Sequence, residues 1–241
     1  MKAFIFAAGL GTRLFPYTKS QPKALVPLLG KPMLQHLILK LKSYHITDII
    51  INIHHFGQQI IDFLNENNHF GCQITISDER DLLLNTGGGL KKALSYLVDG
   101  EDLLVHNVDI LSDLHFNDLM QFHKKQQATI SLLVQKRNTS RYLLFNKEKE
   151  LCGWLNKKTG AKIPDEIKPA NYHEFAFNGI HIINKKALEL FPEEDSFPLI
   201  PVYLKISQSK KISAFEMEDQ FWLDLGKPET IKIAENWLKN V

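Results

Sequence analysis

The stretch AFIFAAGLGTRLFPYTKSQPKALVPLLGKP, residues 3–32, is the part of the sequence around which the fold is arranged. Its first residues, Ala3–Ala8, form a short apolar run that is typical of a buried strand. A loop follows that opens with Gly9 and carries the basic residues Arg13 and Lys23. Glycine allows the backbone to approach a ligand, and consecutive backbone N–H groups attract anions. Arginine and lysine both bind phosphate well, so the stretch predicts a phosphate-binding loop after a strand.

The length and composition fit one large soluble domain, or a domain with a small appendage. The chain has 241 residues, of which 44% are hydrophobic and 23% charged, and its formal net charge is +2. This small charge gives no reason to expect binding to nucleic acid or to an anionic membrane. We expect neither a signal peptide nor a transmembrane segment, and a cytoplasmic location. Cys72 and Cys152 lie far apart in sequence and are expected to be free thiols.

Strand and helix patterns alternate through the first half of the chain. This alternation predicts an α/β fold of parallel βαβ units, with helices on both faces of the sheet. Ligands bind beyond the carboxyl ends of the strands in such sheets, so Gly9, Ser77–Glu79 and Asp109 are expected to share one site. The expected strands are Ala3–Ala8, Asp48–Ile53, Gln73–Ser77 and Leu103–His106. One expected helix begins at Pro32, and two others span Gly57–Asn67 and Gly89–Leu97.

The second half shows a more mixed pattern. Between the expected elements, Asn156–Tyr172 is polar and contains glycine and proline, so we predict an irregular loop or a hairpin there. The expected helices are Phe116–Gln126, Lys185–Phe191, Pro198–Ser207 and Pro228–Leu238. The expected strands are Ala128–Gln135, Arg141–Phe145, Leu151–Leu155, Phe175–Ile183, Ile212–Met217 and Phe221–Leu225.

The opening loop by itself allows several interpretations. The Gly9–Gly11 spacing also occurs in dinucleotide-binding folds, but Leu14 stands where their third glycine would be. The sequence has no GxxxxGK[ST] phosphate-binding motif either. Taken alone, the loop could instead be a tight turn with a surface arginine, and Lys23 could be a solvated lysine.

Five motifs, taken together, resemble the sugar nucleotidyltransferase family, also called nucleoside-diphosphate-sugar pyrophosphorylases. They cover nearly the whole chain in the expected order. The triple glycine and the short chain look most like the N-acetylmuramate-1-phosphate uridylyltransferase branch, and mannose- and heptose-1-phosphate guanylyltransferases are the alternatives. The motifs are FAAGLGTRLFPYTKSQPKALVPLLGKPML at residues 6–34, LNTGGGLKKAL at 84–94, VHNVDIL at 105–111, FNGIHII at 177–183 and FWLDLGKPE at 221–229.

The resemblance implies a Rossmann-like fold with a mixed, mainly parallel sheet flanked by helices, and a small sugar-binding lobe. It implies one nucleotidyltransferase domain over residues 1–241. Within this domain, about residues 1–115 would bind the nucleotide, and about residues 116–241 would bind the sugar and supply the C-terminal helix. The expected partners are a nucleoside triphosphate and a sugar 1-phosphate.

In the family reaction, a sugar-1-phosphate oxygen attacks the α-phosphorus of the nucleoside triphosphate and pyrophosphate leaves. Two polyanions must meet, so positive charges and preorganised N–H donors are the main requirement. We assign Arg13 to the leaving phosphates and Lys23 to the α-phosphate or the sugar phosphate, as the catalytic residues. The residues expected to bind the nucleotide are Ala8, Gly9, Gly11, Thr12, Arg13, Lys23, Glu79, Thr86, Gly87 and Asn107.

The resemblance also implies a Mg²⁺ ion and a sugar-binding strand. Asp109 and Asp224 occupy the motif positions that bind the ion in the family. Asp109 could instead be a turn or helix-capping aspartate, and Asp224 a strand-end residue paired with a nearby lysine. Asn178 and Gly179 match the sugar-side strand, although Gly179 could instead mark a β-bulge. Thr86 could likewise cap a helix rather than border the base.

The chain departs from the family pattern at a few positions. Phe15 stands where many relatives carry arginine, and Val108 where glycine is usual. The E-K-P string of larger relatives is absent, and no lysine among Lys157, Lys158 and Lys162 is assigned in its place. A catalytically silent regulatory subunit that binds sugar nucleotides is the alternative from another class, and retention of the basic and acidic motif residues argues against it. An NAD-dependent oxidoreductase would need an acidic ribose ligand where this chain has His54-His55.

Overall fold

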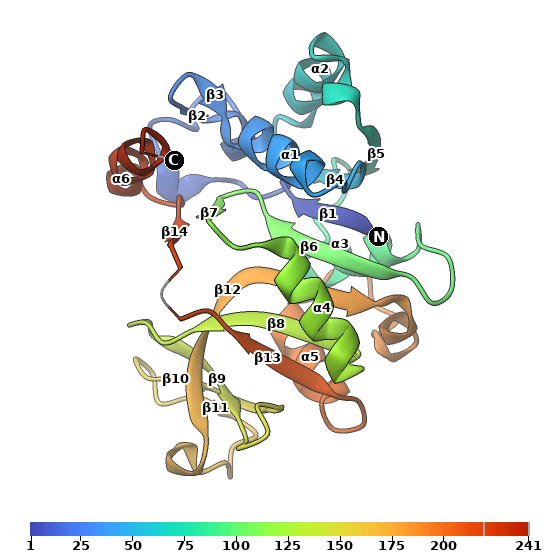
Figure 1. The fold of residues 1–241 in the computed structure, drawn as a ribbon, viewed down its shortest axis with the longest axis vertical. Coiled ribbons are helices and arrows are strands. Elements are labelled where there is room, and N and C mark those ends of the chain that lie inside the picture. Colours follow the sequence, from blue (N-terminus) through green and yellow to red (C-terminus); the bar gives the residue numbers. More distant parts are fainter. Residues whose placement is uncertain (219, 241) are drawn as a thin grey trace.

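A ten-stranded mixed sheet runs through the computed structural model, which describes residues 1–218 and 220–240 (Figure 1). Four of its strands are parallel neighbours in the order β5-β4-β1-β6. They come from the first half of the chain, as the alternating pattern predicts. Their bounds are β1 Lys2–Phe6, β4 Asp48–Ile53, β5 Gln73–Asp78 and β6 Asp102–Asn107.

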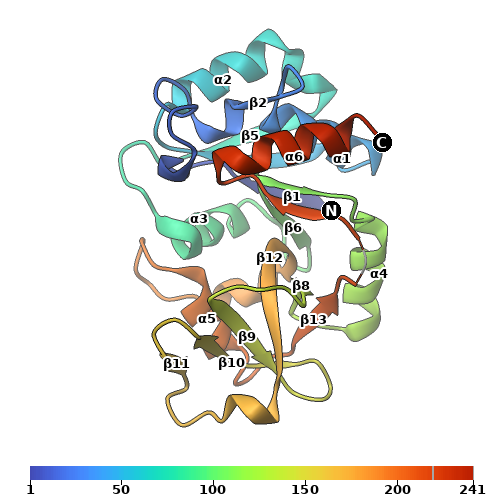
Figure 2. The same ribbon diagram turned by 90° about the vertical axis from the view of Figure 1, so that its left-hand side faces the viewer.

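Helices cover both faces of this sheet because its strands are apolar on both sides. Ile49 and Ile51 of β4 pack in one core cluster, whereas Ile50 between them packs in the other. Successive strand residues point to opposite faces, which explains the alternation. Figure 2 shows the two helical layers on either side of the sheet. One layer holds α1 (Met33–Ser43), α2 (Gly57–Glu66) and α4 (Phe116–Gln126), and the other α3 (Asn85–Leu94) and α5 (Leu199–Ile206).

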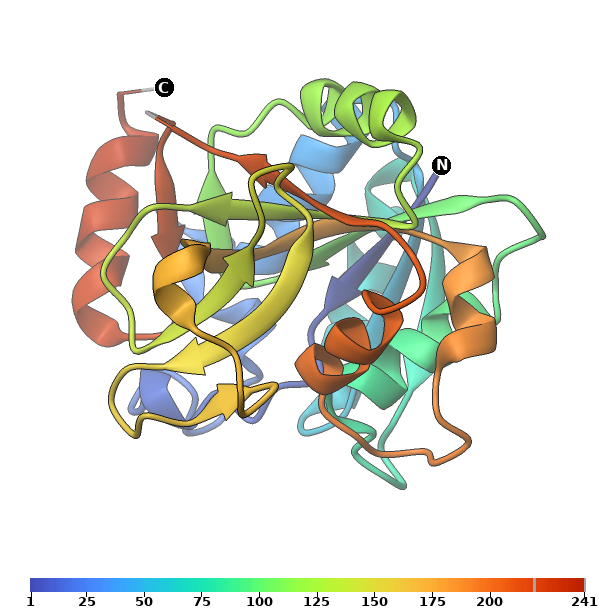
Figure 3. The ribbon, with the colours of Figure 1, turned by 90° about the horizontal axis from the view of Figure 1, so that it is seen from below.

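A long strand, β12 (His173–Asn184), joins the parallel strands to the rest of the sheet. Its second half pairs antiparallel with β6, and its first residues pair with β9. The strands β9, β10 and β11 form a small lobe, seen at the bottom of Figure 1 and towards the viewer in Figure 3. The remaining bounds are β8 Ile130–Gln135, β9 Arg141–Phe145, β10 Leu151–Asn156, β11 Lys162–Ile163 and β13 Ile212–Glu216, which lies parallel to β8.

Two small sheets support the opening loop. In one, β7 (Ile110–Ser112) pairs antiparallel with β14 (Trp222–Asp224), far along the chain. In the other, β2 (Pro27–Leu28) pairs with β3 (Lys31–Pro32). The C-terminal helix α6 (Pro228–Leu238) packs its Ile231 and Ala234 against a cluster that includes Leu14 of the opening loop. Both ends of the sequence therefore contribute to one region.

The predicted fold class is confirmed, but several boundaries differ. The strand predicted for Ala3–Ala8 ends at Phe6, and the helix predicted for Lys185–Phe191 is a short 3-10 helix, Lys185–Leu190. Among the described residues, none of the helices is both long and apolar enough to span a bilayer.

The helix expected to begin at Gly89 begins four residues earlier, at Asn85. Glycine lowers helix propensity, which makes the glycine run look like a loop in the sequence. Tertiary packing overrides this preference: a Cβ on Gly88 would lie 1.8 Å from the backbone oxygen of Asp195. The close approach of α3 to the backbone at Asp195 therefore requires glycine at position 88, inside the helix.

Candidate functional site

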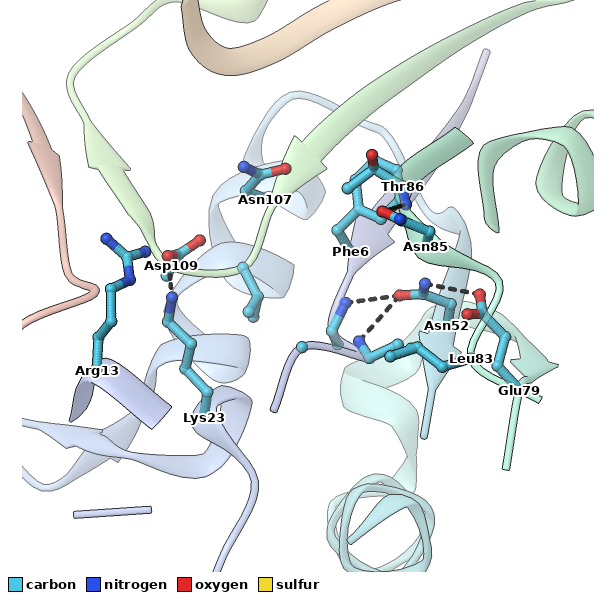
Figure 4. Close-up of a pocket in the computed structure, with 14 residues that line it drawn as sticks. Phe6, Arg13, Lys23, Asn52, Glu79, Leu83, Asn85, Thr86, Asn107 and Asp109 are labelled. Carbon is cyan, nitrogen blue, oxygen red and sulfur yellow. Dashed lines mark hydrogen bonds and ion pairs between the residues drawn. The ribbon is translucent and has the colours of Figure 1, made fainter. Parts of the chain in front are cut away.

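A cavity of about 350 Å³ lies beyond the carboxyl ends of β1, β4, β5 and β6 (Figure 4). Figure 4 shows Arg13, Lys23 and Asp109 at one end, and Asn52 and Glu79 at the other. One end of the cavity, which we call the charged end, therefore holds both basic groups and an aspartate, and the other end holds an amide and a single carboxyl group. Its lining residues are Phe6, Ala7, Ala8, Gly9, Arg13, Lys23, Asn52, Glu79, Leu83, Asn85, Thr86, Asn107, Val108 and Asp109.

An ion pair between Lys23 Nζ and Asp109 Oδ2 dominates the charged end. Both side chains are only 13% exposed. Arg13 and Asp224 form a second, looser pair, with Nη1 3.8 Å from Oδ2, and the Arg13 side chain is 61% exposed. Charges interact more strongly where water is excluded, so Lys23 has the stronger electrostatic influence on the cavity.

Pairing of β7 with β14 brings Asp109 and Asp224 together across a large sequence separation. Asp224 pairs with Ile110, and the backbone N–H of Leu225 donates to the Asp109 carbonyl oxygen at 2.8 Å. The N–H of Gly226 donates to Asp224 Oδ1 at 2.7 Å, which orients this carboxylate. A Cβ at Gly226 would lie 2.7 Å from Arg13 Nη2, so the glycine leaves room for the guanidinium.

These two aspartates fit a hard divalent cation in donor chemistry. Their carboxylate oxygens are the ligands that Mg²⁺ prefers, and Mg²⁺ usually takes one or two carboxylates together with phosphate oxygens and water. Within residues 1–218 and 220–240, no group of three His, Cys, Asp or Glu side chains could hold an ion. The remaining ligands would therefore have to come from a phosphate substrate and water.

Asn52 organises the other end of the cavity. Its Oδ1 accepts hydrogen bonds from the backbone N–H groups of Ala7, at 2.7 Å, and Ala8, at 3.2 Å. Its Nδ2 donates to Glu79 Oε1 at 2.8 Å. Sequence reasoning missed Asn52, although a polar residue near the carboxyl end of the run DIIINI is a usable signal.

Glu79 is a buried carboxylate, only 2% exposed. Burial raises its pKa above the usual glutamate range, and the hydrogen bonds from Asn52 and from the N–H of Leu84 partly oppose that shift. His54 Nδ1 donates to the Glu79 carbonyl oxygen at 2.7 Å. The Glu79 side chain is therefore held in one orientation at the cavity wall.

The structure places the predicted nucleotide-binding residues unevenly. Ala8, Gly9, Arg13, Lys23, Glu79, Thr86 and Asn107 line the cavity, together with Asp109. Gly11, Thr12 and Gly87 are outside its lining. Thr12 lines a separate cavity with Phe15 and His55, and a Cβ on Gly87 would lie 2.3 Å from the Phe197 ring. Thr86 Oγ1 accepts a hydrogen bond from the Leu199 N–H at 3.1 Å, which joins the N-terminal end of α3 to the N-terminal end of α5.

The predicted sugar-binding residues lie next to the cavity rather than in its lining. Gly179 has a φ of +76°, and β12 changes register between Phe177 and His181, so Gly179 does sit in a β-bulge. A Cβ there would lie 2.7 Å from Asn107 Nδ2, a cavity residue. The Asn178 side chain is fully buried and accepts a hydrogen bond from Arg137, a residue that sequence reasoning missed.

A sequence model of the nucleotidyl transferase family matches residues 2–240. The chain is 32% identical over 239 residues to a mannose-1-phosphate guanylyltransferase of Arabidopsis thaliana, covering 95% of this chain and 62% of that protein. It thus spans less than two thirds of that plant relative. It is 29% identical over 235 residues to an N-acetylmuramate alpha-1-phosphate uridylyltransferase of Neisseria meningitidis, covering 98% of this chain and 97% of that protein.

Solved structures show the same fold. HddC from Yersinia pseudotuberculosis, complexed with GMP-PN, superposes with a TM-score of 0.77 at 22% identity, covering 98% of this chain and 99% of that one. The family match extends over nearly every residue of the sheet, the helices and the cavity. The chain therefore belongs to the nucleotidyl transferase family.

Proposed function

We propose that the protein is a sugar-1-phosphate nucleotidyltransferase, which joins a nucleoside triphosphate to a sugar 1-phosphate and releases pyrophosphate. The observation that carries this proposal is the charged end of the cavity. There Lys23 and Arg13 of the opening loop meet Asp109, which pairs with Lys23, while Asp224 pairs with Arg13 from outside the cavity lining. Phosphoryl transfer needs this concentration of charge more than it needs a nucleophilic side chain.

The reaction forms a bond between a sugar-phosphate oxygen and the α-phosphorus. The bond from the α-phosphorus to the bridging oxygen breaks, and that oxygen leaves with the pyrophosphate. Lys23 neutralises charge near the α-phosphate, where its buried amine is most effective. Arg13, which is more exposed, donates to the leaving β- and γ-phosphates through its planar set of N–H groups.

The metal assignment also belongs to this proposal. Asp109 and Asp224 would hold a Mg²⁺ ion, with phosphate oxygens and water as its other ligands. A bound Mg²⁺ supplies positive charge to the phosphate oxygens. Because Asp109 now pairs with Lys23, binding of the ion and release of this lysine towards the phosphates are expected to be coupled.

UTP and N-acetylmuramate 1-phosphate are the favoured substrates. The Neisseria relative named for that reaction is matched over 97% of its length, whereas the Arabidopsis guanylyltransferase is matched over 62%. A mannose- or heptose-1-phosphate guanylyltransferase is the second candidate, because the Arabidopsis relative has the higher identity, 32% against 29%. The charged cavity residues argue against a catalytically silent subunit.

A pyrophosphate-release screen tests the reaction and the substrates together. Four nucleoside triphosphates are paired with N-acetylmuramate, mannose and heptose 1-phosphates in the presence of Mg²⁺. UTP with N-acetylmuramate 1-phosphate is expected to react fastest. Fastest turnover with GTP and mannose or heptose 1-phosphate would replace the favoured pair by the second candidate. No turnover with any pair would contradict an enzymatic function and favour the regulatory alternative.

Asn52→Leu is expected to raise the KM for the nucleoside triphosphate about tenfold, equivalent to ~1.4 kcal/mol. The substitution removes the acceptor that holds the N–H groups of Ala7 and Ala8, so this part of the cavity wall loses its fixed shape. Steady-state kinetics with saturating sugar 1-phosphate measure the change. Asn65→Leu, at an exposed position on α2, is the control. We call the two hydrogen bonds from the Ala7 and Ala8 N–H groups to Asn52 the clamp by Asn52. An unchanged nucleotide KM in Asn52→Leu would show that this clamp does not shape the binding site.

A further inference from the structure

Arg137 lies beyond the end of β8, on the segment that leads into the small lobe. Its Nη2 donates to the Phe177 carbonyl oxygen at 3.0 Å, and its Nε lies 3.3 Å from Asn178 Oδ1, to which it donates. Its Cζ lies 4.2 Å from the centre of the Trp222 ring, whose Nε1 donates to the Asn178 carbonyl oxygen at 2.9 Å. The guanidinium is therefore fixed in position by three neighbours.

This fixed guanidinium has no carboxylate partner in the described part of the chain. None of the ion pairs within 4.0 Å involves it. Arginine carries five N–H donors, and two are used by Phe177 and Asn178. Burial lowers the pKa of Arg137, and the charge of Asp224 is the largest opposing influence. A guanidinium held in a fixed orientation, with donors left over, can donate to an anion without further ordering of its side chain.

Two sets of contacts connect Arg137 with the charged cavity. Through Asn178, it adjoins Gly179, which lies against the cavity residue Asn107. Through Trp222, it adjoins β14, the strand that ends at Asp224. Arg137 thus adjoins the site through residues from the second half of the chain, whereas Arg13 and Lys23 reach the site from the opening loop.

Two lysines of the nearby hairpin, Lys157 and Lys162, are engaged elsewhere, and Lys158 is exposed, with no hydrogen bond or ion pair among the described residues to fix its amine. Lys157 pairs with Glu174, with Nζ 2.5 Å from Oε2, and Lys162 Nζ donates to the Ile167 carbonyl oxygen at 3.1 Å. Arg13 and Lys23 each already have an aspartate partner. Arg137 is therefore the basic residue near the site that has fixed geometry, spare donors and no paired carboxylate among the described residues.

We propose that Arg137 binds the phosphate of the sugar 1-phosphate, donating from its free N–H groups to two phosphate oxygens. Planar, paired donation of this kind suits a phosphate better than a single point charge does. The inference rests on the proposed function and adds the residue that receives the second substrate. Asn178 is then a positioning residue, because its buried amide holds the guanidinium instead of contacting the sugar.

Arg137→Gln is expected to raise the KM for the sugar 1-phosphate by about thirtyfold, with the nucleotide KM within about twofold of the unmodified protein. Arg137→Lys is expected to recover part of the loss, because it keeps the charge without the planar donors. Arg141→Gln, an exposed arginine of the same lobe, is the matched control and should leave both constants unchanged. Melting temperatures of all variants identify any loss of folding, and Arg137→Lys keeps the test valid if Arg137→Gln unfolds.

Two further measurements separate the possible outcomes. Calorimetric titration with UTP and with UDP-N-acetylmuramate measures binding without turnover. If Arg137→Gln binds UDP-N-acetylmuramate more weakly than the unmodified protein does, and binds UTP as well as the unmodified protein does, the inference is supported. If Arg137→Gln binds both ligands as tightly as the unmodified protein does, the inference is overturned while the proposed function stands. If the unmodified protein binds neither ligand nor GTP, the proposed function itself fails. N-acetylmuramate also carries a carboxylate, which could be the group that Arg137 binds, and the methyl ester of N-acetylmuramate 1-phosphate lacks this charge. If Arg137→Gln raised the KM only for the free acid and not for the ester, Arg137 would bind the carboxylate instead of the phosphate.

Discussion

Asp109→Asn is expected to lower the rate of pyrophosphate release at least about a thousandfold, equivalent to ~4 kcal/mol of transition-state stabilisation. The substitution removes one of the two carboxylates proposed to hold the divalent ion, and it leaves Lys23 without its partner. An amide is nearly the same size as the carboxylate, so the loss is one of charge rather than of packing. Manganese binding, followed by electron paramagnetic resonance, should weaken in parallel with the rate.

Asp113→Asn provides the control for this prediction. Asp113 is exposed and only four residues from Asp109, so its substitution changes the net charge equally without touching the cavity. Its turnover and manganese binding are expected to match those of the unmodified protein. If Asp109→Asn retained normal turnover and normal manganese affinity, the assignment of Asp109 to the ion would be wrong.

Lys23→Met is expected to reduce kcat at least about a hundredfold, or ~2.7 kcal/mol, with a smaller effect on the nucleotide KM. The Lys23 side chain is only 13% exposed, so its charge acts on the phosphates with little screening by water. Methionine keeps most of the side-chain volume and removes the charge. Single-turnover measurements of pyrophosphate release report the chemical step directly.

Lys19→Met, in the same loop but exposed, controls for a general loss of positive charge. Lys23→Arg tests geometry, because a guanidinium keeps the charge but cannot occupy the same confined position beside Asp109. A fall in melting temperature large enough to account for the lost turnover of Lys23→Met would show that Lys23 supports the fold and not the reaction.

Much of the fold and the outline of the site follow from local sequence patterns. The apolar runs at β1, β4, β5 and β6 alternate with amphipathic helices. This alternation of strands with helices is enough to predict parallel strands whose carboxyl ends lie at one edge of the sheet. Gly9, Glu79 and Asp109 follow three of those strands, and all three line the cavity. Residues at strand ends could thus be grouped before their contacts were known.

Other features depend on partners that are distant in sequence. The glycine at position 88 of α3, which begins at Asn85, is required by the backbone at Asp195, more than a hundred residues away. The clamp by Asn52 depends on N–H groups 44 and 45 residues away, and the contact of Arg137 with Asn178 spans 41 residues. Local hydrophobic periodicity and residue propensity carry no such information, because these contacts join residues that only the tertiary fold brings together.

The opening loop shows where this division falls. By itself, the sequence determined that a strand ends in a glycine-containing loop with two cations, because apolar periodicity and residue chemistry are local properties. Only the tertiary structure decided which anions those cations meet. Pairing of β7 with β14 places Asp109 and Asp224 beside Lys23 and Arg13, and the bulge at Gly179 brings the Arg137 side of the molecule against the same cavity. Electrostatic interactions act through space, and the distances that govern them are set by how the whole chain folds.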